Sequence, residues 1–114
     1  MTEQQTVWSI NESASIKSYT LINFRTIPQI QQMSKEDQFE MEVVGNVLPF
    51  KTNNYVVEQL IDWNNIPKDP MFVLTFPQKG MLIPEHYDKM ASTLRSGADK
   101  KEIARVANDI RLQL

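Results

Sequence analysis

The residues best suited to acid, base or metal chemistry are few in this sequence of 114 amino acids. His86 is the only histidine, and it stands beside Glu85 directly after Pro84. In the first turn of a helix, the positive end of the helix dipole disfavours a charged imidazole. We therefore interpret His86 as a partly exposed residue at a helix start, and no second histidine is present to complete a metal site.

The carboxylates do not form an evident acid/base pair. Glu40 and Glu42 are two residues apart, so a helix would place them on different sides. Asp62 and Asp69 flank turns, where aspartate side chains commonly cap the backbone. The absence of cysteine excludes disulfides, thiolate zinc sites and iron–sulfur ligands on this chain. We predict no catalytic, cofactor-binding or metal-binding residue.

Large rings are the remaining candidates, and they gather in the middle of the chain. Trp63, Phe72, Phe76 and Tyr87 could stack on a ligand, pack on the chain's own helices or contact a second subunit. A small-molecule site needs converging polar groups, and the Asn and Asp residues nearby commonly cap local turns. We predict that these four rings serve packing or an interface. The sequence leaves open whether they pack within the chain or across subunits.

Residues 15–61 are predicted to form the N-terminal helices. The segment 18–27 fits a helix or a strand, and we favour a helix. Pro28 suits the first turn of a short helix, and Ser34 suits the N-cap of a longer one that Pro49 ends. The next helix, capped by Asn53 or Asn54, would have on its apolar side Tyr55, Val56, Leu60 and Ile61.

Residues 62–83 are predicted to be an irregular, proline-rich connector. Each proline disfavours helical backbone at the residue before it. The stretch 68–70 therefore predicts one turn, and the stretch 76–80 predicts another. The prolines would make the connector stiff, because they reduce the entropy lost on folding.

Residues 84–114 are predicted to form a pair of helices. Pro84 begins the first helix, and Gly97 stands where a C′ glycine would end it. Asp99 and Glu102 have the spacing of a capping box for the second. The apolar stripe of this last helix runs to Leu114 without a stop signal. Either the helix end docks on the domain or the chain is a truncated part of a longer protein, and we favour truncation.

Length and charge limit the fold and function classes to which this protein can belong. One domain is expected for 114 residues, and the predicted fold is all-α, with four or five short helices and the connector between the third and fourth. Residues 1–14 are predicted to be a flexible polar tail with Trp8 as a possible anchor. Twelve basic and fourteen acidic residues argue against a nucleic-acid partner. No apolar segment predicts a membrane span or a secretory signal, and the cysteine-free sequence fits the cytoplasm.

Several stretches carry a resemblance to a known family. They are NNYVVEQLIDW (53–63), the Asp-Pro of 69–70, LTFPQ (74–78) and GMLIPEHYDKM (80–90). In this order they resemble the N-terminal part of the lysine 2,3-aminomutase family of radical SAM proteins. The final stretch, RSGADKKEIARVANDIRLQL (95–114), continues the resemblance, which covers roughly residues 19–114.

The resemblance implies a helical region that precedes a partial (β/α) barrel. In the family that barrel holds a [4Fe–4S] cluster through a C-x-x-x-C-x-x-C motif, uses S-adenosylmethionine and in many members binds pyridoxal phosphate to move an amino group. None of these catalytic positions maps onto this cysteine-free chain. The leading hypothesis is a non-catalytic portion that contacts the catalytic barrel or a second subunit. The rival hypothesis is a stand-alone helical interaction module without enzyme activity.

Overall fold

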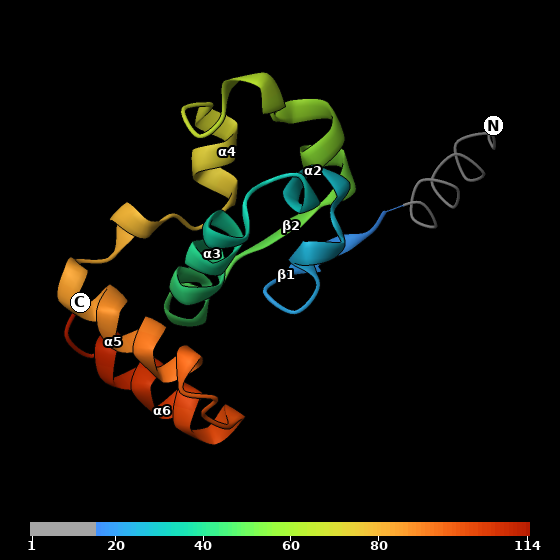
Figure 1. Cartoon of the computed structure of the whole chain (residues 1–114). Helices are drawn as coiled ribbons and strands as arrows, with labels where there is room; N and C mark the ends of the chain where they lie inside the picture. The colour runs from blue at the N-terminus through green and yellow to red at the C-terminus, as the bar shows by residue number, and fades with distance from the viewer. Residues whose placement is uncertain (1–15) are drawn as a thin grey trace.

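The computed structural model describes residues 16–114, which are mostly helical and include helices α2 to α6 and one small sheet (Figure 1). The predicted polar tail and Trp8 lie outside the described residues. None of the helices in this part of the chain has the length and apolar character needed to cross a lipid bilayer.

The small sheet corrects the all-α prediction. Strand β1 (Ser18–Thr20) pairs antiparallel with β2 (Lys51–Asn53), so that Tyr19 stands opposite Thr52. Both of these residues are buried. Segment 18–27, for which we favoured a helix, is therefore a strand followed by a turn and a single 3₁₀ turn, Phe24–Thr26. The pairing joins segments more than 30 residues apart, and a local pattern carries no information about such a partner.

The first helices form where capping residues predicted them. Helix α2 (Pro28–Gln31) begins at its proline, and α3 (Lys35–Val47) begins after Ser34, whose hydroxyl accepts a hydrogen bond from the Asp37 backbone N–H at 3.0 Å. Gly45 lies inside α3, where a Cβ atom would stand 3.0 Å from Leu21 Cδ1 and 3.2 Å from Phe50 Cε1. This glycine therefore allows the β1–β2 region to pack closely against α3.

The turn after β2 differs from the predicted helix. Asn53 does cap it, accepting from the Val56 backbone N–H at 3.0 Å, but residues Val56–Leu60 form a π-helical turn. The wider turn changes which side chains face inward. Val57 and Ile61 are buried, whereas Tyr55 and Leu60, predicted to lie on the apolar side, are exposed.

The predicted irregular connector contains a helix. Helix α4 (Pro70–Thr75) begins after Asp69, whose carboxylate accepts from the Phe72 backbone N–H at 3.0 Å. Lys68 lies in a turn as predicted, but the predicted turn over 68–70 then becomes a helix start, with Asp69 at the N-cap and Pro70 at the first helical position. Short 3₁₀ turns, Trp63–Asn65 and Lys79–Met81, flank this helix on either side.

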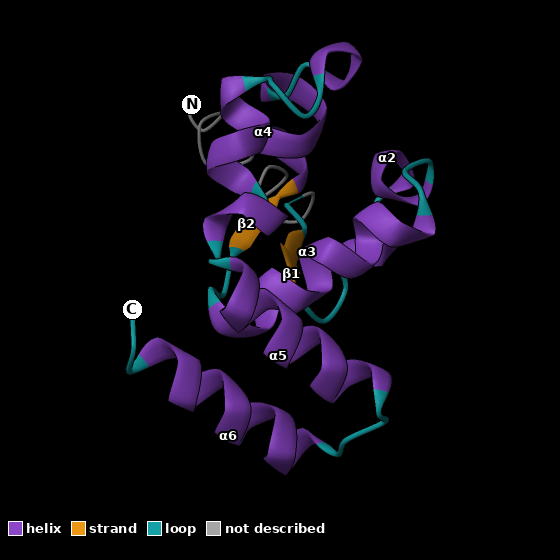
Figure 2. Cartoon of the chain, turned by 60° about the vertical axis from the view of Figure 1, so that its left-hand side comes forward, coloured by secondary structure: helices purple, strands orange, loops and turns teal. Residues whose placement is uncertain are grey.

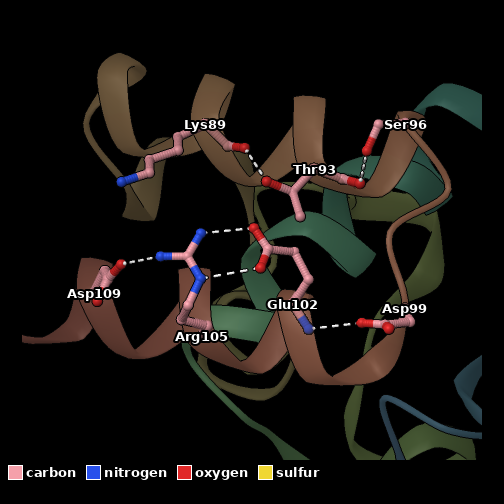
Figure 3. Close-up of polar contacts among 7 residues, drawn as sticks. All are labelled: Lys89, Thr93, Ser96, Asp99, Glu102, Arg105 and Asp109. Atoms are coloured by element: carbon pink, nitrogen blue, oxygen red, sulfur yellow. Dashed lines mark hydrogen bonds and ion pairs between the residues drawn. The ribbon is translucent and has the colours of Figure 1, made fainter.

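The C-terminal helix pair forms at the predicted starts, but α6 ends at Arg111, and Leu114, which we expected on its apolar stripe, is exposed. Helix α5 (Pro84–Arg95) ends before Gly97, which adopts φ 77°, and α6 (Lys100–Arg111) begins after Asp99. The Asp99 carboxylate accepts from the Glu102 backbone N–H at 2.9 Å, while the Glu102 side chain binds Arg105 (Figure 3). Figure 3 also shows Arg105 reaching Asp109, so this surface of α6 is covered by ion pairs.

Two cores lie on either side of α3 (Figures 1 and 2). The helical core joins α3, α5 and α6 and contains Val43, Val44, Val47, Leu82, Tyr87, Met90, Ala91, Val106, Ala107 and Ile110. The aromatic core gathers β1, α2, α4 and the turns around them and contains Tyr19, Phe24, Ile27, Ile30, Met41, Val57, Ile61, Phe72 and Phe76. Because α3 supplies residues to both, it is buried on two sides and connects the two halves.

Candidate functional site

Three of the four predicted packing residues meet in the aromatic core. The Phe76 ring lies 5.5 Å from Phe72, 5.7 Å from Phe50 and 6.2 Å from Trp63. Trp63 donates its indole N–H to the Val57 carbonyl at 2.8 Å, which satisfies its polar atom. These rings therefore pack against one another within the chain, with centroid separations typical of favourable aromatic pairs.

Tyr87, the fourth predicted residue, lies apart from those rings in the helical core. Burial raises the pKa of its phenol, and the nearby Glu40 carboxylate raises it further. The Lys79 ammonium stands over the ring, 4.9 Å from its centroid. Tyr87 thus positions a lysine, and it does not share a site with the other three rings.

His86 corrects our interpretation of a partly exposed residue. Its side chain is buried, with an exposed fraction of 7%. The Nδ1 atom has no hydrogen-bond partner within the described residues. Our interpretation considered only the place of His86 in the first turn of a helix, and a local position of this kind does not report the burial that tertiary packing produces.

An apolar groove lies between the end of α3 and helix α4. It has a volume of about 150 Å³, and its apolar lining includes Leu48, Pro49, Phe50, Val73, Leu74 and Met81. Leu74 is 80% exposed, Met81 is 42% exposed and Val73 is 37% exposed. The apolar groove was not predicted, because an irregular connector over residues 62–83 would have no defined inner and outer face.

A larger, more polar cavity lies beside the first turns of α3. It has a volume of about 490 Å³, and its lining includes Met33, Met41 and Phe72 together with Asp37, Glu40 and Lys79. We call it the α3 cavity. Burial raises the pKa of the Glu40 carboxyl, and the positive charge of Lys79 partly offsets that rise. Glu40 was paired with Glu42 in our prediction, but its neighbour on the helix face is Asp37, one helical turn earlier.

We take the apolar groove and the α3 cavity as the candidate sites. Among residues 16–114, no group of three or more His, Cys, Asp or Glu side chains is arranged to hold a metal ion. The apolar groove is lined mainly by hydrocarbon, whereas the α3 cavity places charged side chains beside apolar ones. When the chain is compared with models of known protein families, with curated proteins and with solved structures, none of them matches it.

Proposed function

We propose that this chain is a non-catalytic docking module of a radical SAM protein similar to lysine 2,3-aminomutase, whose catalytic barrel binds the apolar groove. The observation that carries the proposal is the concentration of exposed apolar side chains around that groove, with Leu74, Met81 and Val73 at its edge. Single exposed apolar residues are ordinary on protein surfaces, whereas adjoining ones mark interaction sites.

The resemblance in the sequence supports the choice of partner. Leu74 lies in the stretch LTFPQ, and Met81 lies in GMLIPEHYDKM, two of the stretches that carry the resemblance. The parent reaction would be migration of an amino group or a related radical isomerisation. In this proposal the barrel holds the [4Fe–4S] cluster, the S-adenosylmethionine and any pyridoxal phosphate, because the cysteine-free chain offers no cluster ligand. We place the protein in the cytoplasm, which a cysteine-free sequence fits.

A second candidate is a stand-alone helical interaction module. The packing of the four rings favours it, because Phe72, Phe76 and Tyr87 are buried within the chain and Trp63 is half-buried there. A chain whose own residues complete both cores buries the apolar area that independent folding needs. Such a module would offer the same apolar groove to a different protein.

The docking proposal can be tested by mixing two purified proteins. The full chain is combined with a catalytic barrel from the aminomutase-like family, expressed without its own N-terminal helical region, and the mixture is followed by sedimentation velocity. We expect one complex, and we expect Leu74→Ser together with Met81→Ser to abolish it. The matched control is Leu112→Ser, since Leu112 is 84% exposed but lies outside the apolar groove.

Each outcome separates the candidates. No complex at micromolar concentration contradicts docking to a radical SAM barrel and leaves the stand-alone module as the better account. A complex that persists in the Leu74→Ser/Met81→Ser variant contradicts the role of the apolar groove. A complex lost equally in Leu112→Ser also contradicts it, because the effect is then not specific to this surface.

A further inference from the structure

The α3 cavity has the size of a ligand site. Its volume of about 490 Å³ lies within the range of about 300–1,000 Å³ that is common for small-molecule pockets. One wall comes from α3, and the opposite wall comes from the 3₁₀ turn at Lys79 and the prolines before it. These walls are brought together by tertiary packing, since they are about 40 residues apart in the chain.

The lining of the α3 cavity contains two acidic side chains and one basic side chain. Asp37 and Glu40 are three residues apart on α3, so they lie on the same face of the helix. Within residues 16–114 neither carboxylate takes part in an ion pair. Lys79 is the one basic side chain in the lining, and its ammonium lies against the Tyr87 ring. Two carboxylates against one ammonium favour a ligand that carries positive charge.

The floor of the α3 cavity is apolar and adaptable. Met33, before α3, and Ile66, from the connector, line it with half-buried side chains, and Met41 and Phe72 of the aromatic core lie beneath them. Methionine side chains are flexible and polarisable, so they fit a range of aliphatic and aromatic shapes. A ligand that matches this floor needs a hydrocarbon body as well as a cationic end.

We propose that the α3 cavity binds a small primary amine with an aliphatic or aromatic body. The ammonium donates hydrogen bonds to Glu40 and Asp37, and the hydrocarbon lies on the half-buried Met33 and Ile66, above Met41 and Phe72. A primary ammonium is a compact charge with three donors, which suits two carboxylates one helical turn apart. Pro77 lines both the α3 cavity and the apolar groove, but neither carboxylate lines the groove, so variants of Glu40 and Asp37 test amine binding without changing the docking surface.

Methyl NMR of the full chain tests the proposal with 2-phenylethylamine as the probe. The methyl signals of Met33 and Met41 should shift on titration, while that of Met90, buried in the helical core, should not. The neutral isostere 2-phenylethanol should bind at least about tenfold more weakly, since a charge-assisted hydrogen bond is lost. Glu40→Gln should weaken amine binding to a similar degree.

The matched control is Glu36→Gln, because Glu36 is exposed in the first turn of α3 but does not line the α3 cavity. Its affinity for 2-phenylethylamine should equal that of the unchanged chain. Asp37→Asn provides a second variant at the site and should also weaken binding. The proposal is overturned if millimolar amine leaves both methionine signals unmoved, if the alcohol binds as tightly as the amine, or if Glu40→Gln and Asp37→Asn retain full affinity.

Discussion

The two cores of this protein differ in the side chains and in the structural elements that form them. The helical core packs aliphatic side chains from three helices of twelve or thirteen residues, each begun at a capping residue or a proline. The aromatic core is assembled from strands, turns and helices of three to six residues, and rings supply much of its contact. Short elements have little stability of their own, so the aromatic half depends on contacts between segments far apart in the chain.

The largest effect should come from the centre of the aromatic core. Phe76 is 1% exposed and contacts the rings of Phe50, Trp63 and Phe72. Phe76→Ala should therefore lower the free energy of unfolding by about 3–5 kcal/mol, because it leaves a cavity among rings that cannot all move inward. Urea unfolding measures this change. Leu74→Ala, on the exposed side of the same segment, should change it by less than about 0.5 kcal/mol.

The same variant tests whether the halves are independent. Because α3 supplies Met41 to the aromatic core and Val43, Val44 and Val47 to the helical core, both halves should unfold together. Far-ultraviolet circular dichroism and Trp63 fluorescence, recorded in a Trp8→Phe background, should give coincident curves for Phe76→Ala and for the unchanged chain. Separate midpoints would show that α3 does not couple the cores.

The next effect concerns the turn that joins α5 to α6. Gly97 has a positive φ of 77° and donates to the Leu94 carbonyl at 3.2 Å, which ends α5. Gly97→Ala should lower stability by about 1–2 kcal/mol, because a Cβ atom disfavours the left-handed region. The control is Gly80→Ala, since Gly80 has no positive φ and a Cβ atom there meets nothing within 4 Å. Equal losses of stability in Gly97→Ala and Gly80→Ala would contradict the role that we give to the backbone conformation of Gly97.

A smaller effect is expected where α6 meets the end of α3. Arg111 donates from Nε to the Val47 carbonyl at 2.8 Å and from Nη2 to the Asn46 carbonyl at 2.9 Å. The last turn of α3 contains no basic residue, so Arg111 supplies the positive charge that a helix C-terminus favours. Arg111→Ala should cost about 1 kcal/mol in urea unfolding.

Arg105→Ala is the matched control for that contact. Arg105 pairs with Glu102 and Asp109, both on its own helix and both at the surface. Exposed pairs of this kind contribute little to stability. If Arg111→Ala and Arg105→Ala lowered the free energy of unfolding equally, the contact between α6 and α3 would contribute no more to stability than a surface ion pair.

The contrast between the cores also explains what the sequence could predict. The starts of α3, α5 and α6 and the end of α5 were predictable because Ser34, Pro84, Gly97 and Asp99 act on their immediate neighbours. The end of α6 at Arg111 was not, since we expected its apolar stripe to continue to Leu114. Strand β1 was not, because its partner is β2, more than 30 residues away. Helix α4 could have been recognised from Asp69 followed by Pro70, a pair that starts helices as well as turns.

The same division between local patterns and contacts of distant segments applies to the candidate sites. Burial of Phe72, Phe76 and Tyr87 follows from their size and apolar character, and tertiary structure shows that they and Trp63 pack within the chain. The apolar groove and the α3 cavity were beyond sequence reasoning, because each joins α3 or its end to residues of the connector. Only packing places Leu48 beside Leu74, or Glu40 near Lys79.

The smallest predicted effect is the pH dependence contributed by Glu40. Burial raises the pKa of this carboxyl in the folded chain above its ordinary value of 4.5, and Lys79 only partly offsets the rise. The folded state therefore binds the proton at a higher pH than the unfolded state does, so Glu40 lowers stability as pH rises through this interval. Glu40→Gln should be slightly more stable than the unchanged chain at pH 7, and the difference should vanish below pH 4.5. Urea unfolding at pH 7 and pH 4 measures it, with Glu58→Gln as the exposed control, because Glu58 does not contribute to the shift of Glu40. A Glu40→Gln variant that is less stable at pH 7 would mean that the Glu40 carboxylate gains more from Lys79 than it loses by burial.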